Sequence, residues 1–257
     1  VNGEPVLSWT LNNIKTMMSD FRFKPAIINT LLLIIIVLPL QFILAIVMAL
    51  LLQSNLRGRT MFLYIYTIPL GISDLAAGLV WVSIFTQRGF LNSFLERLGL
   101  TESPFIFIAA DNYNWMLTII VLAELWRATS IVMIIVVSGL QAIPTDYIEA
   151  GEVFGASLWQ RIRHIILPML KPSLQVALIL RTMLAVQGFS CVVAITGGNV
   201  FTVLANETYR WYQGGDGGFN NPNVAAAYSG LILIISLGVS MIYLRAVRTQ
   251  EEALKSA

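Results

Sequence analysis

The sequence predicts an all-α integral membrane protein, and its composition supplies the first two observations. The chain has 257 residues, of which 57% are hydrophobic and only 12% are charged. Its mean hydropathy is +0.76. Soluble domains carry about 25% charged residues, so this chain has too little charge to cover a water-facing surface. Disorder is excluded for the same reason, because disordered chains have low hydrophobicity.

Long apolar stretches supply the third observation. A membrane-spanning helix needs roughly 20 mainly apolar residues, and barrel strands would be shorter and would alternate. We expect five spans, at about 26–52, 61–85, 115–137, 173–195 and 224–244. The short link 53–60 makes the first two a hairpin. We also expect the second span to break near Pro69 and Gly71, with Asp74 satisfying the freed backbone groups.

The distribution of basic residues favours a cytoplasmic C-terminus. Five spans place the two chain ends on opposite sides. Lys and Arg are in slight excess on the side that holds the loop 138–172 and the tail 245–257, and the positive-inside rule assigns that side to the cytoplasm. Segment 1–25 then lies outside, although it has no signal-peptide pattern. We therefore expect that a helix preceding the first span is missing from this sequence.

The loop 138–172 carries the most specific pattern in the sequence. Pro144 suits the first turn of a helix that Gly155 can end. Ser157 and Gln160 have the spacing of a capping box for a second helix, which Pro168 would end. The loop is thus predicted to form two short helices joined by a glycine elbow.

The same loop resembles the "EAA" coupling loop of ABC importer permeases, E-A-A-x3-G-x9-I-x-L-P. The matching residues are Glu149, Ala150, Gly155, Ile165, Leu167 and Pro168, and Gly151 departs from the second alanine. Other stretches look like sugar-type permeases, and the whole resembles the larger permease of maltose-type importers. These stretches are Asn29-Thr30-Leu31, Leu56-Arg57-Gly58-Arg59, Ala77-Gly78-Leu79-Val80-Trp81, Leu180-Arg181-Thr182 and Ile195-Thr196-Gly197-Gly198.

This resemblance implies a type I ABC importer permease core at 26–244 in a prokaryotic plasma membrane, with a coupling loop at the cytoplasmic face. The implied cargo is a sugar, such as a maltose- or trehalose-type glucan. The implied partners are a second permease, an ATPase dimer and an extracytoplasmic sugar-binding protein. The implied ATPase contacts are Glu149, Ala150, Gly151, Gly155, Leu167 and Pro168. ATP and magnesium would be bound by the ATPase subunits, because this sequence contains no phosphate-binding loop.

Candidate residues for the solute pathway lie in the third and fourth spans. Ionisable residues at membrane depth are costly and usually face a cavity or a partner. Glu124, Arg127 and Arg181 could therefore line the pathway, or they could form an ion-pair lock between helices. The maltose-type resemblance adds Gln187, Gly188 and Ser190, and the alternative is that Gln187 bridges helices. The outer loop 196–223 is expected to contact the binding protein, or its aromatic residues could be anchors at the membrane interface. This loop contains Glu207, Tyr209, Arg210, Trp211 and Tyr212.

Other functions are less well supported by the sequence. The single cysteine, Cys191, and the single histidine, His164, cannot form a metal cage or a catalytic site at membrane depth, so we expect neither. A net charge of +2 gives no indication of nucleic-acid binding. A permease for an amino acid, peptide or phosphate remains an alternative, although two acids and two arginines at membrane depth suit a neutral solute better. A secondary transporter would leave the coupling loop unexplained.

Overall fold

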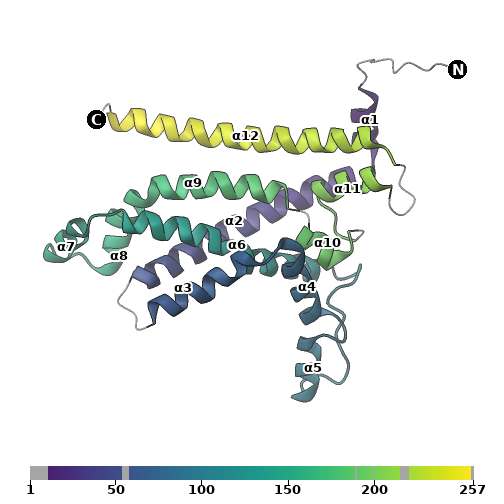
Figure 1. Cartoon of the computed structure of the whole chain (residues 1–257), viewed down its shortest axis with the longest axis horizontal. Helices are drawn as coiled ribbons and strands as arrows, with labels where there is room; N and C mark the ends of the chain where they lie inside the picture. The colour runs from purple at the N-terminus through teal and green to yellow at the C-terminus, as the bar shows by residue number, and fades with distance from the viewer. Residues whose placement is uncertain (1–10, 54–57, 189, 199, 215–219, 256–257) are drawn as a thin grey trace.

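Every regular element in the described part of the chain is a helix. The computed structural model describes residues 11–53, 58–188, 190–198, 200–214 and 220–255. Four long apolar helices lie roughly side by side in Figure 1: α2 (Phe23–Gln53), α6 (Tyr113–Gln141), α9 (Leu167–Val186) and α12 (Pro222–Lys255). Each is long and apolar enough to cross a membrane. The all-α membrane fold predicted from composition is therefore confirmed.

The second expected span is broken where the sequence predicted. Helix α3 (Arg59–Thr67) runs through the 3-10 turn η1 (Ile68–Gly71) and is followed, at a bend of 103°, by helix α4 (Asp74–Phe85). Pro69 lies in this turn and has no N–H to donate. The new helix is capped by Ser73, whose side chain accepts a hydrogen bond from the N–H of Ala76. Asp74 was expected to satisfy the freed backbone groups, and this expectation was wrong because its carboxylate pairs with Arg127 on α6 instead.

The fourth span begins and ends earlier than expected. The apolar helix runs continuously over Leu158–Val186, through α8 (Leu158–Arg161) and the π-helical turn η2 (Ile162–Ile166) into α9. Pro168 does not end the second short helix, so that prediction was wrong. The N–H of Leu167 bonds to the carbonyl of Ile162, five residues back, and this wide turn precedes the proline that lacks an N–H. The expected end of the span forms a separate helix, α10 (Ser190–Thr196).

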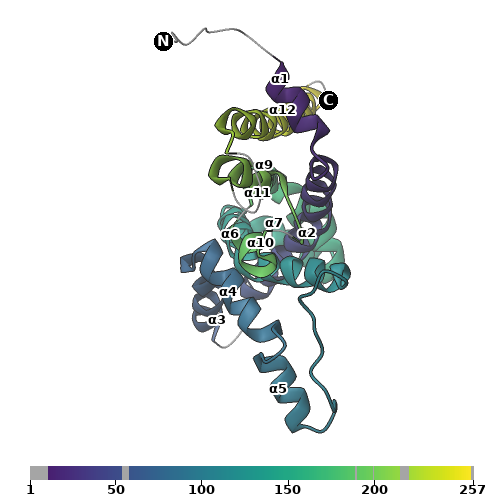
Figure 2. The ribbon, with the colours of Figure 1, turned by 90° about the vertical axis from the view of Figure 1, so that its right-hand side faces the viewer.

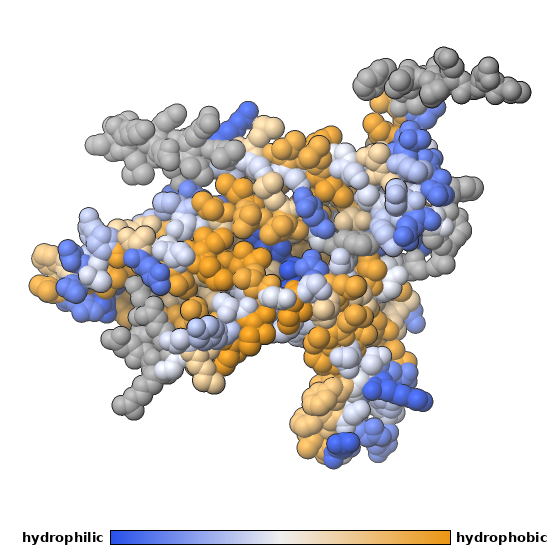
Figure 3. Space-filling view, in the orientation of Figure 1, coloured by the Kyte–Doolittle hydropathy of each residue, from blue (hydrophilic) through white to orange (hydrophobic). Residues whose placement is uncertain are grey.

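The remaining helices are short and lie at the two ends of the bundle. Toward one end, α7 (Thr145–Val153) and α8 form the projecting tip of the coupling loop (Figure 1). Toward the other end lie α1 (Asn12–Ser19) and α11 (Leu204–Gln213), and α5 (Phe90–Arg97) projects sideways (Figures 1 and 2). Apolar side chains gather over the middle of the bundle and hydrophilic ones toward its projecting ends (Figure 3).

Three buried apolar clusters hold these helices together. The first joins α2, α6 and α9, the second joins α6 to α10, and the third joins α1 and the start of α2 to α11 and α12. Two contacts between helices of the bundle leave no room for a side chain in place of glycine. A Cβ at Gly78 on α4 would lie 2.6 Å from the Cβ of Ala194 on α10, and one at Gly139 on α6 would lie 2.7 Å from the Cβ of Ser173 on α9.

Candidate functional site

A buried cluster of charges joins three helices at the centre of the bundle. The Nη2 atom of Arg181 on α9 donates a hydrogen bond of 2.7 Å to the Oε2 atom of Glu124 on α6. Arg127, one turn further along α6, approaches the same oxygen at 3.4 Å and lies 2.8 Å from Asp74 on α4. The structure thus brings together all four ionisable residues that the sequence placed at membrane depth.

Burial is uneven within this cluster. The side chain of Arg181 is only 3% exposed, whereas that of Asp74 is 45% exposed. The Arg181 end is therefore enclosed by protein, and the Asp74 end is open. The enclosed end is stabilised by its pairing, because an unpaired charge at this depth would be strongly unfavourable.

Gln41 on α2 completes the cluster, and no sequence pattern pointed to it. This residue is fully buried. Its Oε1 accepts a hydrogen bond of 2.8 Å from the Nε of Arg181, and its Nε2 donates one of 3.0 Å to the main-chain carbonyl of Glu124. A single glutamine in an apolar helix does not by itself indicate a function. The hydrogen bonds of Gln41 to Arg181 and Glu124 become evident only when the helices are packed together.

The space around the enclosed end of the cluster is small. A cavity of about 30 Å³ is lined by Glu124, Arg181 and Gly188, together with apolar residues of α2 and α10. This volume corresponds to about one water molecule. This cavity is therefore too small to hold a sugar.

A much larger hollow lies between α11, α12 and the end of α9. Its volume is about 560 Å³, within the range of small-molecule sites. Gln187 contributes an amide, Thr208 and Ser229 contribute hydroxyls, and Tyr209 and Tyr212 contribute aromatic rings. The remaining lining residues are Ala205, Pro222, Ala225, Ala226 and Ile232. Among the described residues around this hollow, none is charged, so it suits a neutral ligand.

The pathway candidates at the end of the fourth span do not share one space. Gln187 follows the last residue of α9 and lines the large hollow, whereas Gly188 lines the small cavity. Ser190 begins α10 and is half-buried. Phe189 lies outside the described residues. Of these candidates, Gln187 alone lies with the tyrosines.

The coupling loop has the predicted glycine elbow and capping box. Gly155 has φ of +75°, and the bonds from the N–H of Gly155 to the carbonyl of Glu152 and from Ala156 to Gly151 close the end of α7. Ser157 and Gln160 form both bonds of the capping box at the start of α8. Local sequence signals therefore determine the shape of the loop.

Gly151, the departure from the family motif, lies at the contact between the two arms of this loop. A Cβ there would lie 2.8 Å from the Cδ1 of Ile165 on η2, so the isoleucine side chain occupies the place of the second alanine's methyl group. Glu152 forms an ion pair with Arg161 across the same contact. Leu167 and Pro168 belong to the first turn of α9 and continue the second arm into the span.

The tip of the coupling loop exposes large apolar side chains. Val153 and Phe154 are 86% and 89% exposed, and Leu158 and Trp159 are also well exposed. Glu149 and Ala150 lie exposed on α7. An apolar tip of this kind on the water-facing end of a bundle is typical of a protein-binding surface.

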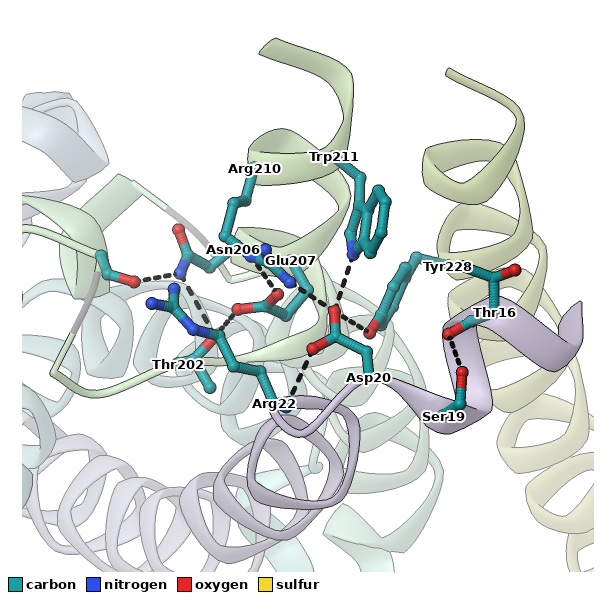
Figure 4. A network of polar contacts seen from close by, with 11 residues as sticks. Thr16, Ser19, Asp20, Arg22, Thr202, Asn206, Glu207, Arg210, Trp211 and Tyr228 are labelled. Atoms are coloured by element: carbon teal, nitrogen blue, oxygen red, sulfur yellow. Dashed lines mark hydrogen bonds and ion pairs between the residues drawn. The ribbon is translucent and has the colours of Figure 1, made fainter. Parts of the chain in front are cut away.

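The outer loop forms a helix with two different faces. Glu207 and Trp211 of α11 are buried and do not belong to the surface that a partner could contact, and contact through the rest of the loop stays a prediction. Glu207 accepts a hydrogen bond from Arg210, and Trp211 donates one to Asp20, which also accepts from Arg210 and Tyr228 (Figure 4). Tyr209 and Tyr212 of the same helix are exposed. The glycine-rich stretch 215–219 after α11 lies outside the described residues.

A bundle of apolar helices with a broken span and an exposed coupling loop is the architecture of the membrane subunit of a transport system. Residues 41–248 match the family "Binding-protein-dependent transport system inner membrane component". The chain belongs to this family, and it is an integral membrane permease subunit of an ABC transport system.

Individual relatives indicate which transport systems this chain is similar to. The chain is 32% identical to the trehalose/maltose transport system permease protein MalF of Thermococcus litoralis, over 83% of this chain and 70% of the relative. It is 30% identical to the trehalose transport system permease protein SugA of Mycobacterium tuberculosis, over 74% of this chain and 59% of SugA. A crystal structure of a bacterial ABC transporter involved in alginate import has the same fold. Its TM-score is 0.74 at 19% identity, over 95% of this chain and 85% of that one.

Proposed function

We propose that this chain is a pathway subunit of an ATP-driven importer for a neutral di- or oligosaccharide. The observation that carries the proposal is the uncharged hollow lined by Gln187, Tyr209 and Tyr212. A sugar presents hydroxyl groups at its edges and C–H groups on its ring faces. Amide and hydroxyl side chains pair with the former, and aromatic rings pack against the latter.

The relatives support a sugar of this class. The MalF relative is named for the transport of trehalose and maltose and the SugA relative for that of trehalose, and both sugars are neutral disaccharides. An amino acid would bring an ammonium and a carboxylate group into the hollow, where the described lining residues offer no opposite charge. Burying such charges without partners is unfavourable, so the amino-acid and peptide alternatives are weaker.

The open end of the charged cluster is a second candidate contact on the pathway. Arg127 and the half-exposed Asp74 lie at this end. The Nε of Arg127 is buried and has no hydrogen-bond partner among the described residues. A rotation of the Arg127 side chain toward the open end would expose this donor to a solute hydroxyl. In this proposal, Arg181 holds Glu124 and Glu124 positions Arg127, so Arg181 itself does not touch the solute.

The coupling loop is proposed to bind one ATPase subunit. Phe154 and Val153 project from the elbow as apolar anchors, and Glu149 lies on the same arm. The ATPase subunits would bind ATP and magnesium, and this chain would bind neither. The loop and the C-terminal tail would then face the cytoplasm of a prokaryotic cell. A second permease would complete the pathway, and a sugar-binding protein would deliver the solute from outside.

Transport by the reconstituted complex tests this proposal. The chain is co-expressed with its partner permease, ATPase and binding protein, and the complex is placed in proteoliposomes. We expect ATP-dependent uptake of labelled maltose or trehalose that an excess of unlabelled sugar inhibits and that histidine, methionine and phosphate do not inhibit. Uptake inhibited by an amino acid or by phosphate, and not by sugars, would overturn the proposed solute class.

A further inference from the structure

We propose that a buried network of Asp20, Glu207 and Arg210 positions the tyrosine face of α11, and thereby sets solute affinity without contacting the solute. This inference rests on the proposed function, because it takes the hollow at Tyr209 and Tyr212 as the solute site. Asp20 and Glu207 are positioning residues in this scheme, and neither lines the hollow.

Asp20 lies at the junction of α1 and α2 and accepts hydrogen bonds from four groups. Its Oδ2 accepts from the Nε1 of Trp211 at 2.8 Å, from the hydroxyl of Tyr228 at 3.4 Å and from Arg210. Its Oδ1 accepts from the backbone N–H of Arg22 at 3.0 Å. One carboxylate therefore ties the start of α2 to both α11 and α12 (Figure 4).

Glu207 extends the network to the loop before α11. Its side chain is completely buried. Its two oxygens accept hydrogen bonds of 2.5 Å from the Nε of Arg210 and from the Oγ1 of Thr202. Asn206 donates to the carbonyl of Gly198 at 2.6 Å, which fixes the same loop (Figure 4). Arg210 thus lies between two carboxylates from different parts of the chain.

The two faces of α11 connect this network to the hollow. Leu204, Glu207 and Trp211 follow helical spacing and face the interior. Ala205, Thr208, Tyr209 and Tyr212 follow the same spacing on the other face and line the hollow. A rotation of α11 about its axis would therefore move both tyrosines. Charge-assisted hydrogen bonds to buried carboxylates are strong and directional, so the network opposes that rotation.

The two carboxylates of the network can each be replaced by an amide of the same shape to test their role. Asp20→Asn keeps the shape of the side chain but loses the negative charge that holds Arg210. Glu207→Gln keeps an acceptor for Thr202 and loses the charge on the other side. Asp111→Asn, which changes an exposed carboxylate in the loop before α6, is the matched control.

A cysteine reporter in the hollow measures solute binding directly. Ser229 lines the hollow from α12 and is exposed, so Ser229→Cys is a near-isosteric change at a position outside the network. The native Cys191 is buried, and the parent chain serves as the labelling blank. The complete transporter in lipid nanodiscs is labelled with N-ethylmaleimide at increasing concentrations of maltose or of trehalose, and the half-protecting concentration is read.

With the native network, we expect one of these sugars to protect the introduced cysteine from labelling. In Asp20→Asn and in Glu207→Gln, the half-protecting concentration should rise about tenfold, which corresponds to about 1.4 kcal/mol. Asp111→Asn should leave it unchanged. Partial unfolding would instead lower the fraction of protein that can be protected, without changing the half-protecting concentration of the folded fraction. Arg210→Gln removes the contacts with both carboxylates, so adding Asp20→Asn to it should cause little further loss.

Two results would count against the inference in different ways. Protection at the same concentration in the native chain and in both network variants would overturn the positioning role and leave the proposed solute site intact. An absence of protection by either sugar in the chain with the native network would overturn the proposed solute site, and the inference with it.

Discussion

Arg181 on α9 and Glu124 on α6 form a buried ion pair of 2.7 Å, and Gln41 on α2 is hydrogen-bonded to both residues. The pair joins three long helices at one point. Arg127 pairs with both Glu124 and Asp74, so the cluster of charges also includes the broken second span. The charges at membrane depth were expected either to join helices by ion pairs or to line the pathway. The buried Arg181 end of the cluster fits the first interpretation, and the open Asp74 end leaves room for the second.

Breaking this pair should destabilise the protein. Arg181→Gln leaves the Glu124 carboxylate buried without its main partner, which costs about 3–5 kcal/mol. Thermal unfolding of the purified chain in detergent should show a clear fall in the transition temperature. Arg163→Gln, which removes an exposed arginine from η2, is the control and should have little effect. Adding Glu124→Gln to Arg181→Gln should recover part of the loss, and a purely additive result would show that the two residues are not coupled.

The glycine elbow should be required for coupling. Gly155 has φ of +75° and open space around its Cα, so Gly155→Val acts only through the backbone. A β-branched residue in this conformation costs about 1–2 kcal/mol and would reorient the loop. We expect ATP hydrolysis to continue while uptake falls. Gly155→Asn is the control, because asparagine tolerates left-handed backbone. Coupled transport by Gly155→Val at the native rate would contradict the coupling role.

The apolar tip should anchor the ATPase subunit. Phe154→Asp places a charge on a side chain that is 89% exposed, so the chain itself should fold normally. Docking would require that charge to be buried, and we expect the ATPase to be lost during co-purification. Phe94→Asp on α5 makes the same change at an exposed position away from the coupling loop (Figure 1). Equal retention of the ATPase by both variants would argue against docking at Phe154.

Close packing at the broken span should be sensitive to a single methyl group. Gly78→Ala would place its Cβ 2.6 Å from that of Ala194, and overpacking of this kind costs about 1–3 kcal/mol. Gly238→Ala on α12, which has no heavy atom within 4 Å of its added Cβ, should be neutral or slightly stabilising. Thermal unfolding of the two variants distinguishes these outcomes, and equal transition temperatures would refute tight packing of α4 on α10.

Features set by neighbouring residues could be predicted from the sequence. The break at Pro69, the elbow at Gly155 and the capping box at Ser157 each depend on a few consecutive residues. The pairing of Glu124 with Arg181 was also predicted, because few partners are available to a charge at membrane depth.

Contacts between distant parts of the chain could not be predicted in this way. Asp20 and Arg210 are 190 positions apart, and an outer loop with polar and aromatic residues gives no indication that Glu207 is buried. The role of Gln41 could not be predicted for the same reason. The continuation of the helix through Pro168 depends on a wide π-helical turn, which no residue type specifies.

The central claim is that the hollow at Gln187 and Tyr209 carries a neutral sugar through this subunit. ATP-driven uptake of labelled trehalose or maltose by the reconstituted complex tests it most directly, with Gln187→Leu and Tyr209→Ala combined in this chain. We predict that sugar uptake falls at least tenfold while the subunits still assemble and hydrolyse ATP. Uptake at the native rate in the double variant would contradict the claim.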